Sequence, residues 1–243
     1  MTNLSVNLNK VALIRNTRNI GIPCITKMAK ICIDAGAKGI TVHPRPDQRH
    51  IRPGDVYDLV DVVTPVEFNI EGNPLESSFM DIVRRVKPTQ CTLVPDTPDT
   101  FTSDSGWDLT QDKERLIPII EELHSLGSRV SLFMDADVAQ ISLVPDTDAE
   151  RIELYTEPYA TAYREDRDLE STWQQYADAA EKAQNLGLGV NAGHDLNLDN
   201  LAKFCTIPGI LEVSIGHALT AEALEMGLAN TVKAYLEILE RSL

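Results

Sequence analysis

Histidine and glutamate side chains stand at the ends of several short, β-rich segments of the sequence. His43, His194 and His217 each end such a segment, and Glu71 ends another within the otherwise apolar stretch EFNIEGNP. Imidazole titrates near neutral pH and burial raises the pKa of a carboxyl group, so these four side chains could give and take protons in general acid-base catalysis. Each also has a plainer interpretation, which is a structural hydrogen bond for a histidine and a salt bridge for Glu71.

A second set of residues could bind phosphate. Arg15, Arg18, Arg45 and Arg49 follow the first two β-rich segments, and His50 lies close by. Taken singly, each arginine is as well explained by a solvated surface position. The segments that end in NAGHD and SIGHA contain glycines, which let backbone N–H groups and a helix N-terminus approach a phosphate.

These residues must be positioned by the strands that they end. Eight β-rich segments alternate with segments of helical apolar spacing, and several of the eight are nearly continuous in apolar residues, as expected of a parallel sheet. The eight begin near residues 4, 39, 65, 90, 129, 151, 187 and 210. The pattern predicts a single α/β domain over residues 1–243, a (β/α)8 barrel in which the carboxyl ends of the strands meet at one mouth.

Two long segments without helical spacing follow predicted strands. They cover residues 95–108 and 156–167. Substrate loops and lids of barrel enzymes arise at these positions, so we expect either segment to be able to close over a substrate.

Composition narrows the class of protein. The 243 residues carry a formal net charge of -15, which argues against a nucleic-acid-binding surface but leaves small phosphorylated ligands possible. The first ten residues, MTNLSVNLNK, lack the features of a secretory signal, and no apolar run is long enough for a membrane helix. We therefore expect a soluble, cytoplasmic protein.

The sequence resembles the pyridoxine 5'-phosphate synthase family, which forms the pyridine ring of vitamin B6. The resemblance covers essentially the whole chain and rests on VNLNKVALIRNTR, GITVHPRPDQRHI, FNIE, CTLVPD, VSLFMDAD, LGVNAGHDL and EVSIGHAL. It implies a (β/α)8 barrel that condenses 3-amino-2-oxopropyl phosphate with 1-deoxy-D-xylulose 5-phosphate to pyridoxine 5'-phosphate, phosphate and water. It implies no metal and no organic cofactor, and it implies a homo-octamer assembled from dimers.

The resemblance also implies roles for individual residues. His43 and Glu71 would be proton acceptors and His194 a proton donor. Asn7 and Arg18 would contact the amino ketone.

Further residues would bind phosphorylated substrate by the same resemblance. Arg45, His50 and Thr102 would hold the deoxyxylulose phosphate, with Thr102 in the first of the two long segments. Gly216 and His217 would cradle a phosphate group.

Three substrate-binding positions depart from the usual pattern of the family. Asn9 and Lys10 stand where the commonest motif has aspartate and histidine; asparagine loses the negative charge, and lysine keeps a cation but is not a neutral imidazole. Asp195 stands where glycine is common. A carboxylate repels phosphate, so we expect the Asp195 side chain to point away and its backbone amide to stay available.

Other functions fit some of the same residues. His43, Glu71, His194 and His217 could hold a divalent metal in a barrel hydrolase or aldolase. Lys10 could form a Schiff base, although the sixth predicted strand lacks the lysine that such aldolases often use. The chain could also be a phosphate-ligand binder without turnover, to which the residues at 9, 10 and 195 would lend support.

Overall fold

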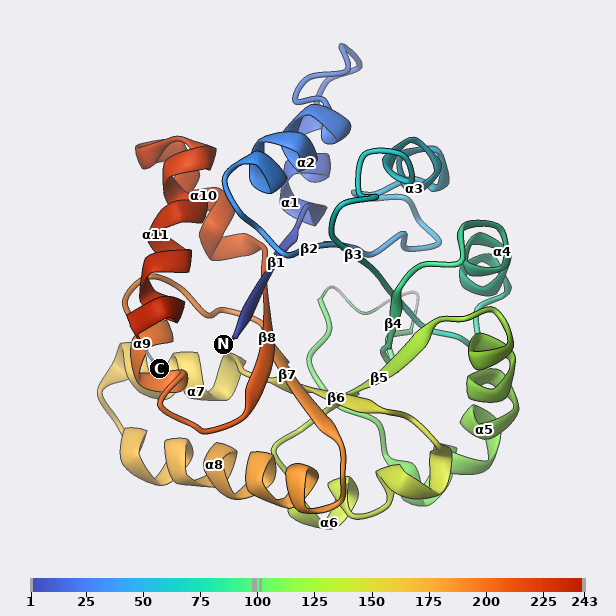
Figure 1. Ribbon diagram of the computed structural model, residues 1–243, viewed down its shortest axis with the longest axis vertical. Coiled ribbons are helices and arrows are strands. Elements are labelled where there is room, and N and C mark those ends of the chain that lie inside the picture. Colours follow the sequence, from blue (N-terminus) through green and yellow to red (C-terminus); the bar gives the residue numbers. More distant parts are fainter. Residues whose placement is uncertain (1, 98–99, 101, 242–243) are drawn as a thin grey trace.

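Eight parallel strands form a closed barrel in the computed structural model, which describes residues 2–97, 100 and 102–241 (Figure 1). The strands are β1 (Asn3–Asn7), β2 (Gly39–Val42), β3 (Glu67–Gly72), β4 (Gln90–Leu93), β5 (Arg129–Met134), β6 (Arg151–Tyr155), β7 (Gly189–Gly193) and β8 (Ile210–Ile215). Each strand pairs with the next along the chain, and β8 closes the ring on β1, with Ile215 opposite Val6. The predicted barrel and its eight strands are confirmed.

Helices surround the barrel on its outer side (Figure 1). They are α1 (Asn9–Asn16), α2 (Ile25–Asp34), α3 (Pro53–Leu59), α4 (Ser77–Val86), α5 (Leu109–Ser125), α6 (Val138–Ile141), the 3-10 helix η1 (Val144–Thr147), α7 (Glu157–Glu165), α8 (Leu169–Asn185), α9 (Leu201–Phe204), α10 (His217–Met226) and α11 (Leu228–Arg241). Within the described part of the chain, no helix is both long and apolar enough to span a membrane.

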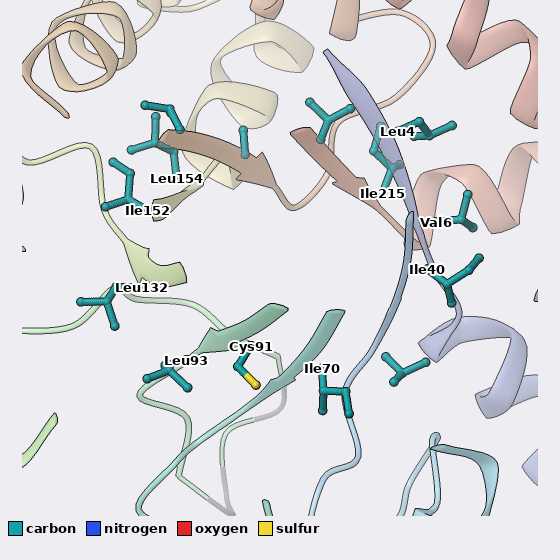
Figure 2. Packing of buried hydrophobic residues seen from close by; sticks show 14 of the residues in the cluster. Leu4, Val6, Ile40, Ile70, Cys91, Leu93, Leu132, Ile152, Leu154 and Ile215 are labelled. Atoms are coloured by element: carbon teal, nitrogen blue, oxygen red, sulfur yellow. The ribbon is translucent and has the colours of Figure 1, made fainter. Parts of the chain in front are cut away.

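The hydrophobic core lies between the strands and these helices. Along each strand, side chains alternate between the two faces of the sheet. Leu4 and Val6 of β1, Ile40 of β2 and Leu154 of β6 are fully or almost fully buried in this outer layer (Figure 2). Burying a side chain of this size contributes about 1.5 to 3 kcal/mol, so this layer supplies the main driving force for closing the barrel.

The inner face of the barrel is polar, whereas branched aliphatic residues usually fill this space. Ser5 and Thr41 share a hydrogen bond of 2.7 Å between their hydroxyl oxygens. Asn69 Nδ2 donates to Thr92 Oγ1 (3.0 Å), and the Thr92 hydroxyl lies within hydrogen-bond distance of both Asn69 Oδ1 and Glu153 Oε2. All five residues are buried, and the hydrogen bonds among them satisfy their polar groups.

A second polar layer lies nearer the amino ends of the strands. Gln90 and Asn191 both donate to Oε1 of the buried Glu212, each over 3.4 Å. Arg129 donates to Gln90 Oε1 (2.9 Å) and pairs with Glu67. The strands are therefore apolar toward the helices and polar toward the barrel axis, and not apolar on both faces.

The two long segments after strands differ from each other. Residues 95–97, 100 and 102–108 run without regular structure from β4 to α5, while residues 98, 99 and 101 of the predicted lid lie outside the described part. The prediction that 156–167 lacks a helix is wrong, because α7 occupies most of it. Pro158 lies in the first turn of α7, where proline breaks no helical hydrogen bond, so it favours this helix and does not interrupt it.

Candidate active site

A cavity of about 410 Å³ opens at the carboxyl ends of the strands. This volume lies in the range that small-molecule sites occupy. Twelve of the thirteen predicted site residues line it: Asn7, Asn9, Lys10, His43, Arg45, His50, Glu71, Thr102, His194, Asp195, Gly216 and His217. The closure of the barrel brings these residues together from segments that are far apart in the sequence.

Arg18 is the predicted residue that lies outside this lining. It follows α1 in an exposed segment, and the neighbouring Ile20 and Ile22 are 55% and 66% exposed. Arg15, from the last turn of α1, is likewise turned from the cavity and forms an ion pair with Asp55. Within a single chain, the first-helix arginines therefore do not reach the cavity.

His43 and Glu71 face each other on neighbouring strands. The distance from His43 Nδ1 to Glu71 Oε2 is 3.8 Å, and each residue is only 5% exposed. Asn7 Nδ2 donates to both Glu71 oxygens, over 3.5 and 3.3 Å. Asn9 Oδ1 accepts a hydrogen bond of 2.9 Å from the His43 backbone amide, so β1 and the start of α1 hold both members of the pair.

Burial sets the protonation of this pair. It raises the pKa of Glu71 to about 7, with the Asp96 carboxylate adding to the rise and the Arg45 guanidinium opposing it. Burial lowers the pKa of His43 well below its ordinary value, and the positive charge of Arg45 adds to this effect. At neutral pH, His43 is thus an uncharged base beside a carboxyl group that is close to half ionised.

His194 occupies the opposite side of the mouth, directly after β7. Its ring lies edge-on to Phe133 and Tyr155, with centroid distances of 5.1 and 5.4 Å. Burial lowers the pKa of His194 to about 4, although the Asp195 carboxylate opposes this change. Its Nδ1 atom is buried and has no hydrogen-bond partner in the described part of the chain. An unpaired ring nitrogen beside a substrate cavity is placed to exchange a proton with a ligand.

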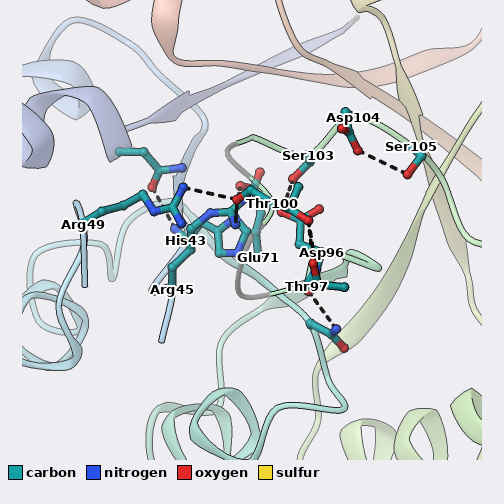
Figure 3. Close-up of polar contacts among 12 residues, drawn as sticks. His43, Arg45, Arg49, Glu71, Asp96, Thr97, Thr100, Ser103, Asp104 and Ser105 are labelled. Carbon is teal, nitrogen blue, oxygen red and sulfur yellow. Dashed lines mark hydrogen bonds and ion pairs between the residues drawn. The ribbon is translucent and has the colours of Figure 1, made fainter. Parts of the chain in front are cut away.

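Arg45 connects the cavity to the segment that follows β4. Its guanidinium forms an ion pair with Asp96, and both side chains are 5% exposed. Arg45 Nη1 donates to the Thr100 carbonyl over 2.9 Å, and Arg49 Nη1 donates to the same carbonyl over 3.2 Å (Figure 3). Ser103 Oγ donates to Asp96 over 2.7 Å, so the segment is tied down at both 100 and 103.

The start of α10 forms the glycine-containing part of the lining. Gly216 precedes the helix, and a Cβ atom on it would lie 3.0 Å from the Asn7 side chain. A larger residue would therefore push Asn7 out of place. Gly216 and His217 leave the first backbone N–H groups of α10 near the cavity, where they could bind an anion.

The lining also includes Arg49, one of the arginines expected to be able to bind phosphate, and six residues without a predicted role: Leu13, Ser103, Glu153, Tyr155, Glu157 and Ser214. Tyr155 and Ser214 occupy inward positions near the carboxyl ends of β6 and β8, so the two-residue alternation along a strand could have identified them. Ser103 lies in an irregular segment, and no sequence pattern predicts which way such a residue faces.

The arrangement suits proton transfer on a phosphorylated ligand. Three imidazole or carboxyl groups with shifted pKa values, His43, Glu71 and His194, share one cavity with the cations Lys10 and Arg45. In residues 2–97, 100 and 102–241, no group of three or more His, Cys, Asp or Glu side chains is arranged to hold a metal ion.

Residues 4–241 match the family model described as pyridoxal phosphate biosynthesis protein PdxJ. The chain belongs to the PdxJ family. It is similar to proteins named pyridoxine 5'-phosphate synthase from Albidiferax ferrireducens, with 54% identity over 97% of this chain and 96% of the relative, and from Parabacteroides distasonis, with 55% identity over 97% and 98%.

Solved structures with low sequence identity support the barrel fold alone. Phosphoribosyl anthranilate isomerase from Thermotoga maritima superposes with a TM-score of 0.60 at 11% identity, over 99% of this chain and 100% of that one. A structure titled KGPDC from Streptococcus mutans gives 0.64 at 12% identity, over 99% and 98%.

The three residues that depart from the usual pattern of the PdxJ family, at positions 9, 10 and 195, all line the cavity. Asn9 uses its side-chain oxygen to accept from the His43 amide, a bond that an aspartate at this position could equally accept. Lys10 adds a cationic side chain to the lining of the cavity. Asp195 is exposed and forms part of the lining.

Proposed function

We propose that this chain is a pyridoxine 5'-phosphate synthase. It condenses 3-amino-2-oxopropyl phosphate with 1-deoxy-D-xylulose 5-phosphate, giving pyridoxine 5'-phosphate, phosphate and water. The observation that carries the proposal is that His43, Glu71 and His194 line one cavity together with cationic residues. The chain is also about half identical in sequence to proteins of that name. The whole chain, residues 1–243, acts as one domain.

Glu71 and His43 are the proton acceptors in this proposal. The amine adds to a ketone with loss of water to form an imine, phosphate leaves, water adds, and an aldol-type closure followed by loss of two further waters makes the ring aromatic. Protons must leave carbon and nitrogen in several of these steps. A carboxyl group with a pKa of about 7 beside an uncharged imidazole can accept protons and pass them on near neutral pH.

His194 is the proton donor, although its pKa of about 4 leaves it uncharged when the cavity is empty. A bound phosphate dianion raises the pKa of a nearby imidazole, because the negative charge favours the protonated form. Substrate binding therefore prepares His194 to donate, and its Nδ1 has no hydrogen-bond partner among the described residues.

The remaining predicted residues bind the substrates. Arg45 and Lys10 supply positive charge, His50 and Thr102 supply hydrogen bonds to the deoxyxylulose phosphate, and Asn7 holds the amino ketone. The backbone at 195, 216 and 217 receives a phosphate group. No metal or organic cofactor takes part in this scheme.

Arg18 contacts substrate only if subunits associate. Its segment carries the exposed side chains of Ile20 and Ile22, which are suited to an interface between copies of the chain. We propose a homo-octamer, as the family resemblance implies, in which Arg18 reaches the substrate of a neighbouring subunit. The protein works in the cytoplasm on small phosphorylated molecules, and its net charge of -15 disfavours nucleic acid.

The pH dependence of turnover should follow the ionisation of Glu71. Because the carboxylate is the base, kcat is expected to rise with pH as Glu71 ionises and to level off above its pKa of about 7. His43 has a lowered pKa and stays uncharged in this range, and the bound phosphate keeps the His194 proton in place in the substrate complex. The measurement is kcat from about pH 5 to pH 9 with both substrates saturating. A profile that is flat across neutral pH would contradict this role.

The proposed reaction is tested by giving the purified protein both phosphorylated substrates and following formation of the fluorescent pyridine product and release of phosphate. We expect both products in equal amounts. Binding of 1-deoxy-D-xylulose 5-phosphate is measured in parallel. Tight binding without product would identify a non-catalytic binder, and activity that appears only with an added divalent metal would favour the metal-dependent alternative.

A further inference from the structure

The backbone that carries His194 is held in an unfavourable conformation. His194 and Asp195 are consecutive residues with φ of +84° and +58°, although neither is glycine. Side chains with a Cβ atom rarely adopt this left-handed region, and two in succession persist only when surrounding contacts hold them. The direction of the His194 imidazole depends on this turn, because the turn sets where its Cα–Cβ bond points.

Thr156 holds the start of this turn, while the buried Asn200 holds its end by donating from Nδ2 to the Asp195 carbonyl over 3.0 Å. The Thr156 hydroxyl oxygen lies 2.6 Å from the Gly193 carbonyl oxygen and 2.5 Å from the His194 carbonyl oxygen. This one hydroxyl group is therefore within donating distance of the carbonyl groups of two successive residues. The Thr156 backbone N–H also donates to the Gly193 carbonyl over 2.9 Å. One residue thus contacts the chain immediately before and within the turn.

The position of Thr156 is itself well defined. It is fully buried, directly follows β6 and precedes α7, and its carbonyl accepts from the Ala160 amide over 3.0 Å. Tyr155, the residue before it, pairs with Gly193 between β6 and β7. Thr156 is therefore fixed in place by β6 and α7, and it fixes in turn the backbone that carries His194.

Thr156 does not line the substrate cavity, so its hydroxyl has no direct part in the chemistry. The rings of Phe133 and Tyr155 restrict the His194 imidazole from its sides. We propose that Thr156 is a positioning residue that holds the His194–Asp195 turn and thereby aims the His194 imidazole at the substrate.

This proposal rests on the proposed function of His194, and its test is built to separate the two. In Thr156→Val the side chain keeps its shape but loses the hydroxyl, while the backbone bond to Gly193 remains and preserves strand pairing. Thr156→Ser keeps the hydroxyl. Misplacing a catalytic group by about 1 Å can cost on the order of 100-fold in rate, so we expect kcat of Thr156→Val to fall about 10- to 100-fold with KM little changed. We expect Thr156→Ser to keep kcat within about threefold of wild type.

A second buried threonine provides the matched control. Thr147 donates its hydroxyl to the Val144 carbonyl over 2.7 Å and lies away from the cavity, so Thr147→Val should lose a similar hydrogen bond without loss of kcat. The NMR signals of the His194 ring in the substrate-free protein give a readout without turnover, and they should shift in Thr156→Val but not in Thr147→Val.

Two results would overturn the proposal while the wild type is active: wild-type kcat and His194 signals in Thr156→Val, or an equal loss in Thr156→Val and Thr156→Ser. If Thr156→Val does not fold, Thr156→Ala compared with Thr156→Ser answers the same question. An inactive wild-type protein would instead refute the proposed function.

Discussion

His43→Ala and Glu71→Gln are each expected to lower kcat/KM by a factor on the order of 100 to 10,000, the usual contribution of a general acid or base. Both side chains are 5% exposed and lie in the cavity, with His43 Nδ1 3.8 Å from Glu71 Oε2. Glutamine keeps the shape of Glu71 and its ability to accept from Asn7, but it cannot take a proton. The loss therefore reports on proton transfer and not on shape.

A histidine outside the site serves as the control for these variants. His124 lies on α5 and its Nε2 is 3.1 Å from Glu150 Oε2, remote from the cavity lining. His124→Ala should retain wild-type kcat/KM. Initial rates of pyridine formation are compared at equal concentrations of folded protein, checked by thermal unfolding. Full activity in a folded His43→Ala or Glu71→Gln variant would refute the assignment of the bases.

Breaking the ion pair between Arg45 and Asp96 is expected to have the largest effect on stability. Both side chains are 5% exposed, and removing one partner of a buried pair typically costs about 3 to 5 kcal/mol, because the other charge is left buried and unpaired. Arg45→Met should lower the free energy of unfolding by about this amount. It also removes the bond to the Thr100 carbonyl, so binding of the phosphorylated sugar should weaken in the same variant.

An exposed ion pair offers the comparison. Arg84 Nε lies 2.6 Å from Glu122 Oε1, but the two side chains are 48% and 37% exposed, so Arg84→Met should leave the free energy of unfolding almost unchanged. Urea unfolding of Arg45→Met, Asp96→Leu and the double variant completes a double-mutant cycle. We expect the double variant to be more stable than either single one. Strictly additive losses would mean that the two charges do not stabilise each other.

Much of the fold could be predicted from the sequence because strand and helix periods differ. Each β-rich segment begins within about two residues of the start of the observed strand, a normal uncertainty for element ends. The residues at those ends reached the cavity because parallel strands in a closed barrel share one mouth. Arg18 did not, since it follows a helix and its direction depends on how the chain leaves α1.

Other features depend on contacts that no local pattern encodes. The partner of Arg45 is Asp96, which lies 51 residues away in an irregular segment. Residues 156–167 lack helical apolar spacing, but Pro158 lies in the first turn of α7, where proline favours a helix. The fully buried Thr156 at that junction likewise gave no signal of its contact with the His194 backbone.

The polar inner face of the barrel has a consequence for how the strands can assemble. Shifting β1 by one residue against its neighbours would turn Leu4 and Val6 toward the axis and present Ser5 to the helices. Such a shift would bury hydroxyl and amide groups without hydrogen-bond partners in the hydrophobic layer between the strands and the helices. It would also break the hydrogen bond between Ser5 and Thr41. A barrel filled with aliphatic side chains on both faces would tolerate the same error more easily. The hydrogen bonds along the barrel axis therefore favour the native strand register over misaligned closures of the barrel.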